Sequence, residues 1–263
     1  MQEELKQDLL TLRNLISDDR IAEIASNALK EALRVTIEMK IRNIISFMKF
    51  TVASSVKLTK YLCKTVREEK WAAPKKWLID LKDQLKSKTE KIKKTWESMT
   101  QQQKVDTAID FAIVALSAFL ISGGFDLEGG LPDIDTKFGV GKHRNLFTHS
   151  ILIGLTLEFA IRFLVALVIE SEKHGYVPKS KLLQSFLNFA KKHHNAAISG
   201  MWLGLFLHFA KDANLFNTRT KPYTGISGLS MRQHQSLFAS NALAAAIFSQ
   251  PSESTIKQKF EGW

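Results

Sequence analysis

Cysteine is almost absent from this chain: among its 263 residues, Cys63 is the only one. A single thiol can form neither a disulfide framework nor a cysteine-based zinc site, and it is consistent with a reducing compartment. Proline and glycine are also scarce, with 5 and 13 residues, so few positions interrupt long periodic stretches. The segment 1–8 is charged and lacks the apolar core of a cleavable signal peptide, so we do not expect secretion by that route.

Apolar residues make up 45% of the chain, which is ample for a buried core, and most of them recur at helical spacing. We therefore predict an all-α protein, a helical bundle with an additional N-terminal helical module. The sequence shows no internal repeat and no convincing strand. Pro74 and the pair Gly123 and Gly124 are expected breaks. The expected helices cover residues 5–16, 21–63, 75–96, 105–122, 151–170, 181–192, 195–213 and 230–248.

The formal charge of +11 is concentrated in the first part of the sequence. Residues 1–104 carry 22 Lys/Arg against 14 Asp/Glu, whereas residues 105–263 carry 15 against 12. Such an excess of positive charge favours a polyanionic partner, either an anionic lipid surface or nucleic acid. The alternative is a solvated basic face without a specific partner, and the sequence also leaves a homo-oligomer open.

The apolar segment 151–169 approaches the roughly 20 residues that a bilayer span requires. Glu158 and Arg162 interrupt it, and an ionised group at mid-bilayer costs about 2.5–3.5 kcal/mol on insertion scales. Because they stand four residues apart, they can pair on one helix face. The mean hydropathy of −0.08 argues against a multi-span protein. We expect association with the cytoplasmic side of a membrane, with a soluble cytoplasmic protein as the alternative.

Two carboxylates follow Pro132 in a loop, where Asp133 and Asp135 flank a single residue. In an extended backbone both side chains face the same way. They can then share a cation, because the cation relieves their mutual repulsion. The alternative is a pair of acidic capping residues in a turn.

Histidines complete the group of candidate ligands. His143 and His149 bracket a short segment, and Thr148 is a suitable N-cap for the helix that follows. The dipole at a helix N-terminus disfavours imidazolium, so it favours the neutral, metal-binding form of His149. His208 and Asp212 stand four apart and share one face of an otherwise apolar helix. Burying them without a partner would cost several kcal/mol, which favours a metal; a mutual hydrogen bond on a solvated face is the alternative.

Several further residues are weaker candidates. Arg144 could clamp a phosphate or a developing oxyanion, with a solvated arginine as the alternative. Asp126 could support the ligands or lie in a turn, while His193, His194 and His234 have no spacing argument. The sequence contains no P-loop, nucleophile elbow or zinc-finger spacing, so we expect no nucleotide cofactor.

Taken together, these motifs resemble those of bacterial membrane-bound metal-dependent hydrolases, a family distantly similar to zinc-dependent phospholipases C and single-strand nucleases. The matching blocks are Leu-Pro-Asp-Ile-Asp at 131–135, His-Arg-Asn-Leu-Phe-Thr-His-Ser at 143–150 and His-Phe-Ala-Lys-Asp at 208–212. The second block carries one more residue between Arg144 and Thr148 than the shorter form of the family. The resemblance covers residues 105–248 and implies a metal, hydrolysis and frequent membrane attachment.

The predicted metal site therefore lies between a loop and two core helices of the bundle. The expected ligands of one or two divalent ions, zinc first and manganese or magnesium as alternatives, are Asp133, Asp135, His143, His149, His208 and Asp212. Asp135 and Arg144 are the expected catalytic residues. The expected parts of the chain are a basic amphipathic helical module at 1–100, a hydrolase-like domain at 105–248 and a tail at 249–263.

The leading functional prediction is a metal-dependent hydrolase of phosphoester bonds, in phospholipid or nucleic acid, that acts through metal-activated water. The alternative is a non-catalytic basic helical protein that binds a membrane or nucleic acid and contains a structural metal site. A third interpretation is a helical interaction protein with ordinary histidines and no metal. An exchangeable water position on the metal would favour the first, because structural sites are closed by protein ligands.

Overall fold

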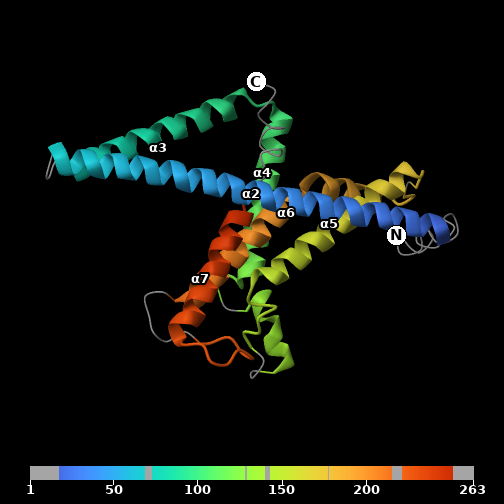
Figure 1. The fold of residues 1–263 in the computed structure, drawn as a ribbon. Coiled ribbons are helices and arrows are strands. Elements are labelled where there is room, and N and C mark those ends of the chain that lie inside the picture. Colours follow the sequence, from blue (N-terminus) through green and yellow to red (C-terminus); the bar gives the residue numbers. More distant parts are fainter. Residues whose placement is uncertain are drawn as a thin grey trace. The chain divides into compact units, whose positions relative to one another are not determined.

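The computed structural model describes residues 18–68, 73–127, 129–139, 143–176, 178–214 and 221–250. Within these ranges the chain forms helices and no strand, so the predicted all-α helical bundle is confirmed (Figure 1). The elements are α2 (Asp18–Glu68), α3 (Ala73–Ser98), α4 (Gln101–Ser122), the 3-10 helix η1 (Pro132–Phe138), α5 (Ile151–Lys173), α6 (Lys181–Ala213) and α7 (Met231–Phe248). The helix expected at 5–16 and most of the expected tail lie outside the described residues.

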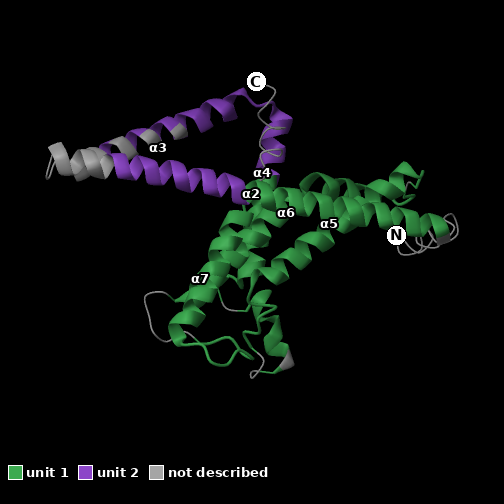
Figure 2. Cartoon of the chain, in the orientation of Figure 1, with its two compact units in different colours: residues 1–43, 110–263 green, residues 44–109 purple. Residues whose placement is uncertain are grey.

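The chain divides into two compact units (Figure 2). Unit 1 comprises residues 1–43 and 110–263, and unit 2 comprises residues 44–109. The start of α2 thus belongs to the same compact unit as residues 110–263. The sequence pattern had assigned the start of α2 to a separate N-terminal module. The predicted division by function stays a prediction.

The core of unit 1 forms around α6, which packs against both α5 and α7. Trp202, Leu205 and Phe209 of α6 are fully buried. Phe248 near the end of α7 packs edge-on against Trp202, with ring centroids 5.0 Å apart. Side chains at this spacing form one helix face, which explains why the apolar stretch of α6 becomes the centre of the bundle.

Two glycines bring α6 against the backbone of α4. A Cβ atom at Gly200 would lie 2.4 Å from the carbonyl oxygen of Val114, and one at Gly204 would lie 2.6 Å from that of Ala118. These separations are too short for any side chain. The missing side chains therefore allow the close approach that places Ser122, the last residue of α4, beside α6.

Two helix boundaries differ from the predictions. α6 is continuous where we expected one helix to end at residue 192 and another to begin at 195. No glycine or proline interrupts this stretch, and the buried His193 contacts Asp110 of α4, with 2.7 Å between Nδ1 and Oδ1. Thr148 does not cap α5 either. The N-cap is Ser150, whose hydroxyl accepts a hydrogen bond from the Leu152 N–H.

A buried ionic cluster links three helices of unit 1. Glu158 in α5 is fully buried, and its Oε1 accepts a hydrogen bond from Nε of Arg162 at 3.0 Å, which confirms the predicted pair. Its Oε2 lies 2.5 Å from Nζ of Lys40 in α2 and 2.6 Å from Nε1 of Trp202 in α6. Every partner is a donor or a cation, so the cost of burying this carboxylate is offset locally.

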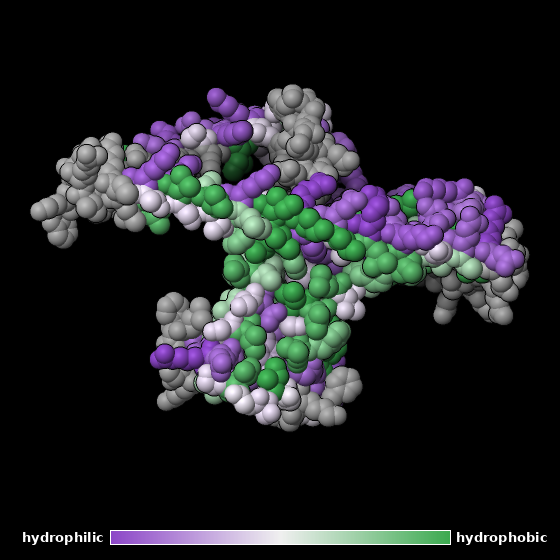
Figure 3. All heavy atoms as spheres, viewed as in Figure 1, coloured by the Kyte–Doolittle hydropathy of each residue, from purple (hydrophilic) through white to green (hydrophobic). Residues whose placement is uncertain are grey.

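Large apolar side chains remain exposed on several helices. By length and composition α4 and α5 can each cross a bilayer, a test that core helices of soluble proteins also pass. Figure 3 shows apolar atoms along one edge of α2 and polar atoms along the opposite edge. On the unit 1 part of α2, the exposed apolar side chains recur every four residues: Leu29, Leu33, Ile37 and Ile41.

Candidate metal site

Asp133 and Asp135 project from η1, a 3-10 helix, and not from the loop that we predicted, so the extended backbone that would turn both side chains the same way does not form. Pro132 occupies the start of this helix, where its missing N–H leaves no hydrogen bond unmade. Oδ2 of Asp133 accepts a hydrogen bond from the Gly129 N–H at 2.7 Å, and Oδ1 faces the histidines. The helical turn thus gives the two carboxylates different surroundings.

Asp135 is held by the segment that follows it. Its Oδ2 accepts hydrogen bonds from the backbone and the side-chain amide of Asn145, at 3.1 Å and 3.0 Å, and from the Thr148 hydroxyl at 2.7 Å. Its Oδ1 lies 3.1 Å from Nδ1 of His143. Both oxygens of Asp135 are therefore engaged by the protein, and this carboxylate positions its neighbours.

Thr148 also determines the tautomer of His149. Because its single hydroxyl proton goes to Asp135, Oγ1 accepts a hydrogen bond from Nδ1–H of His149, 3.0 Å away. Nε2 of the neutral ring then carries a lone pair, and it lies 3.1 Å from Oδ1 of Asp133. The carbonyl of the fully buried His149 accepts a hydrogen bond from the Tyr223 hydroxyl at 2.7 Å, which fixes the backbone.

His208 and Asp212 of α6 present one free atom each. Nδ1–H of His208 donates to the Ser122 carbonyl at 3.0 Å, so Nε2 carries the lone pair. Oδ1 of Asp212 accepts a hydrogen bond from Nη2 of Arg144 at 2.6 Å. Nε2 of His208 and Oδ2 of Asp212 are buried without hydrogen-bond partners and lie 3.5 Å apart. The predicted helical face is therefore buried, and the alternative of a mutual hydrogen bond on a solvated face is wrong.

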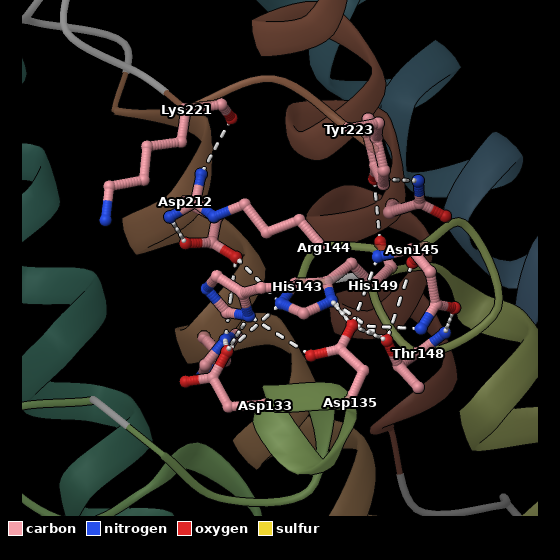
Figure 4. Close-up of polar contacts among 12 residues, drawn as sticks. Asp133, Asp135, His143, Arg144, Asn145, Thr148, His149, Asp212, Lys221 and Tyr223 are labelled. Atoms are coloured by element: carbon pink, nitrogen blue, oxygen red, sulfur yellow. Dashed lines mark hydrogen bonds and ion pairs between the residues drawn. The ribbon is translucent and has the colours of Figure 1, made fainter. Parts of the chain in front are cut away.

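Four electron-pair donors converge at this point: Oδ1 of Asp133, Nε2 of His149, Nε2 of His208 and Oδ2 of Asp212. Figure 4 shows three of these residues, Asp133, His149 and Asp212, side by side. The four separations between a carboxylate oxygen and an imidazole nitrogen are 3.1, 3.5, 3.5 and 3.7 Å. Ligand atoms bound tetrahedrally at 2.0–2.1 Å lie about 3.3 Å apart. Lone pairs at these distances repel one another unless a cation or protons lie between them, so the donor set fits a divalent metal.

The described residues contain two groups that could hold a metal ion, Asp133-His143-His149 and His149-His208-Asp212. Within each group the ligand atoms lie within 4.8 Å of one another. His149 belongs to both groups, and only its Nε2 is free. The two groups therefore describe overlapping parts of one centre and not two independent sites.

Arg144 holds the ligands together. Its φ of 65° lies in the left-handed region, a strained conformation that is common at functional sites. While Nη2 binds Asp212, Nη1 donates to the Lys221 carbonyl at 2.8 Å. The guanidinium therefore fixes Asp212 and the chain before α7, and its predicted role as a phosphate clamp stays a prediction.

The charges of the site shift the pKa values of its members. Burial alone would raise the pKa of Asp133, but the neighbouring imidazoles of His149 and His208 outweigh it and lower this pKa well below its usual value. Burial likewise opposes the bonds from Thr148 and His143 that lower the pKa of Asp135. For His208, burial lowers the pKa, yet Asp133 and Asp212 raise it overall. Without a metal, the centre therefore favours ionised Asp133 and Asp135 together with a protonated His208.

Apart from Arg144, the weaker sequence candidates lie outside the site. Asp126 is exposed in a turn after α4. His193 pairs with Asp110, His194 contacts the Lys191 carbonyl, and Nδ1 of His234 accepts a hydrogen bond from a backbone N–H at 3.2 Å.

The sequence did not predict the groups that hold the candidate ligands in place, which are Asn145, Thr148, Tyr223 and the Ser122 carbonyl. Only the first two carried a signal, because they lie inside the histidine motif.

No protein-family model, curated protein or solved structure matches this chain. The resemblance to membrane-bound metal-dependent hydrolases therefore rests on the three sequence blocks alone. That histidine and aspartate side chains suited to metal binding lie close together is a separate observation, because it comes from the structure.

Proposed function

We propose that this protein is a metal-dependent hydrolase of phosphoester bonds, in the family that its three motifs resemble. One observation carries the proposal: Nε2 of His208 and Oδ2 of Asp212 are buried without hydrogen-bond partners beside two further lone-pair donors. Leaving such atoms unpaired costs about 1–3 kcal/mol for each group. A bound cation removes that cost.

The proposed ligands of one ion are Asp133, His149, His208 and Asp212. Mixed imidazole and carboxylate ligands at these separations suit zinc, with manganese as the alternative. Asp135 and Arg144 act as positioning residues in this assignment, because both oxygens of Asp135 and both Nη atoms of Arg144 are engaged by the protein. When bound, the ion supplies a water of lowered pKa and an electrophile for a phosphoryl oxygen.

The protein supplies the entrance to this centre. His143 and Asp133 have side-chain exposures of 21% and 14%, whereas His149 and His208 have 0% and 3%. A substrate therefore reaches the centre past His143, whose Nδ1 is held by Asp135. His143 is the proposed contact to the phosphoester, and the net charge of +11 favours anionic substrates.

The test uses the purified full-length chain, stripped with a chelator and then repleted with zinc, manganese or magnesium. Metal content is measured by mass spectrometry. Hydrolysis is measured with bis(4-nitrophenyl) phosphate, phosphatidylcholine vesicles and a single-stranded oligonucleotide. We expect activity that requires repletion and falls at least about 100-fold in the His208→Ala/Asp212→Ala variant. The matched control, His174→Ala/Asp83→Ala, removes the same residue types from outside the site. Full activity of the first variant would contradict the proposal.

A structural metal site is the second candidate, and the number of ligands favours it. Four protein ligands complete a tetrahedral shell, as in structural zinc sites. In that case chelation lowers the melting temperature while no phosphoester is cleaved by the repleted protein. Activity of the repleted protein in any of the three assays would exclude it.

The proposed location is the cytoplasmic side of a membrane. Its support is the composition of unit 2, where residues 44–109 carry 15 Lys/Arg against 7 Asp/Glu and the exposed apolar side chains include Phe50, Ile79 and Ile92. A basic surface with apolar side chains is the pattern of proteins that lie on anionic lipid. Nucleic acid is the alternative partner.

A further inference from the structure

A second concave site lies between α2 and α5, away from the candidate metal centre. Its volume is about 490 Å³, within the 300–1,000 Å³ range of small-molecule sites. It is lined by the C-terminal half of α5, whereas the metal site adjoins the opposite end of that helix. Its apolar lining consists of Ala32, Val35, Val165, Ala166 and Ile169.

The charged groups at the cavity are unequal in number. Four cationic side chains line it, Lys30, Arg34, Arg162 and Lys173, against two carboxylates, Glu31 and Glu170. Glu170 pairs with Lys173 at 2.5 Å, while Arg34 pairs with Glu31 at 2.7 Å and also with Glu38, which is not part of the lining, at 3.0 Å. Among the residues that line the cavity, cationic side chains are therefore in excess.

Arg162, which also lines the cavity, is a buried cation. It is 5% exposed, and its carboxylate partner Glu158 also binds Lys40, so two buried cations share one buried anion. An excess of one positive charge in a buried cluster is unfavourable without a counter-ion. Burial lowers the pKa of Lys40 although Glu158 opposes the shift, and the charge of Arg162 adds to the lowering. Burial also lowers the pKa of His194, which lines the cavity, and the charge of Arg162 again adds to the lowering.

We propose that this cavity binds a single-chain amphiphile with an anionic head group, a carboxylate or a phosphate monoester. The head would balance the charge of Arg162 and Lys30. The hydrocarbon chain would cover the apolar lining formed by Val35, Val165 and Ile169. The site is independent of the proposed hydrolytic activity, so its occupancy does not depend on a metal.

Binding is measured with 11-(dansylamino)undecanoic acid, whose fluorescence rises in an apolar site, on the full chain with and without zinc. We expect one saturable site from which dodecanoate or dodecyl phosphate displaces the probe. The stronger of the two competitors identifies the head group. Dodecyltrimethylammonium, with the same chain and a cationic head, should compete at least tenfold more weakly. Equal competition by the cationic amphiphile, or no saturable binding, would overturn the proposal.

Variants locate the site. Lys30→Glu reverses a rim charge on an exposed residue and should weaken probe binding at least tenfold, while Ala166→Leu should do so by filling the cavity. Two controls leave the cavity intact: Lys181→Glu reverses an exposed charge on α6, and Ile37→Ser removes an apolar side chain from the exposed stripe of α2. Wild-type affinity in both cavity variants, or an equal loss in Ile37→Ser, would place the probe on the surface.

Discussion

At the scale of single residues, the geometry of the candidate site depends on Thr148. Its hydroxyl donates to Asp135 and accepts from His149, so one oxygen determines both the carboxylate position and the imidazole tautomer. The sequence pattern gave this residue a helix cap, a role that Ser150 performs two positions later. A capping threonine and a threonine that holds a ligand have the same local sequence. Only the position of Asp135, 13 residues earlier, separates the two roles.

Replacing Thr148 with valine keeps the shape of the side chain and removes the hydroxyl. Nδ1 of His149 then loses its acceptor, so the ring is no longer held with Nε2 toward Asp133. We expect zinc affinity to fall about 10–100-fold, the usual effect of losing a partner of a ligand. A competition titration with a chelating dye measures this. Thr148→Ser should retain most of the affinity. Thr156→Val, which removes an exposed hydroxyl bonded within α5, should have no effect.

The pKa shifts at the site predict how the stability of the metal-free protein depends on pH. The raised pKa of His208 gives a stabilising contribution that is complete below its usual value of 6.5 and is lost as the pH rises through the raised value. The lowered pKa values of Asp133 and Asp135 give contributions that are complete above 3.8 and are lost as the pH falls through the lowered values. Stability should therefore be greatest between these limits.

Urea unfolding in the presence of a chelator measures this dependence. We expect the free energy of unfolding to decrease from pH 6 to pH 9, and zinc to restore it at the alkaline end, because the cation replaces the proton between the same side chains. His208→Gln should flatten the alkaline decrease. A decrease of the same size in that variant would assign the effect to another group.

At the scale of helices, close contact between α4 and α6 depends on the glycines of α6. Gly204→Ala places a Cβ 2.6 Å from a backbone oxygen of α4, so the helices must separate. Overpacking costs about 1–3 kcal/mol, which exceeds the gain of about 1 kcal/mol from the better helix propensity of alanine. We expect a net loss of stability in urea unfolding. Ser185→Ala, at an exposed position of the same helix, is the control and should change stability by less than about 0.5 kcal/mol.

The contact between α2, α5 and α6 depends on Glu158. Glu158→Gln removes the negative charge and leaves Lys40 and Arg162 buried together without compensation. Breaking a buried ion pair from one side costs about 3–5 kcal/mol, so the transition midpoint in urea should fall strongly. The partly exposed pair between Glu172 and Lys191 provides the control: Glu172→Gln should cost less than about 1 kcal/mol. Similar losses in both variants would show that the buried pair has no special role.

Sequence periodicity was sufficient to predict the main helices, because their apolar positions and their Gly, Pro and Ser boundaries are local properties. It failed where contacts between residues distant in sequence determine the local structure. The continuity of α6 accompanies the contact of His193 with Asp110, and η1 forms where a loop was expected. For the site, the motifs identified the side chains that converge. The motifs did not show which of these side chains are free to bind a metal and which are already hydrogen-bonded to the protein. That difference arises only in the folded chain, where Asn145 and Thr148 bind Asp135.

At the scale of the whole molecule, the positive charge and the candidate chemistry belong to different compact units. Unit 2 carries 15 Lys/Arg against 7 Asp/Glu within residues 44–109, while the four proposed ligands all lie in unit 1. Exposed apolar residues accompany the charge in unit 2, among them Phe50, Ile79 and Ile92. We therefore predict that unit 2 attaches the protein to anionic lipid independently of the metal.

Vesicle co-sedimentation separates attachment from chemistry. We expect binding to phosphatidylcholine vesicles that contain phosphatidylglycerol and much weaker binding to phosphatidylcholine alone, because each Lys or Arg near an anionic surface contributes about 1 kcal/mol. Lys82→Glu/Lys86→Glu, on an exposed part of α3, should weaken binding at least tenfold and leave zinc content unchanged. The control Lys181→Glu/Arg232→Glu makes the same change of charge in unit 1. Equal weakening by both pairs would mean that total charge matters and not its position, whereas binding that persists in high salt would assign attachment to the apolar side chains.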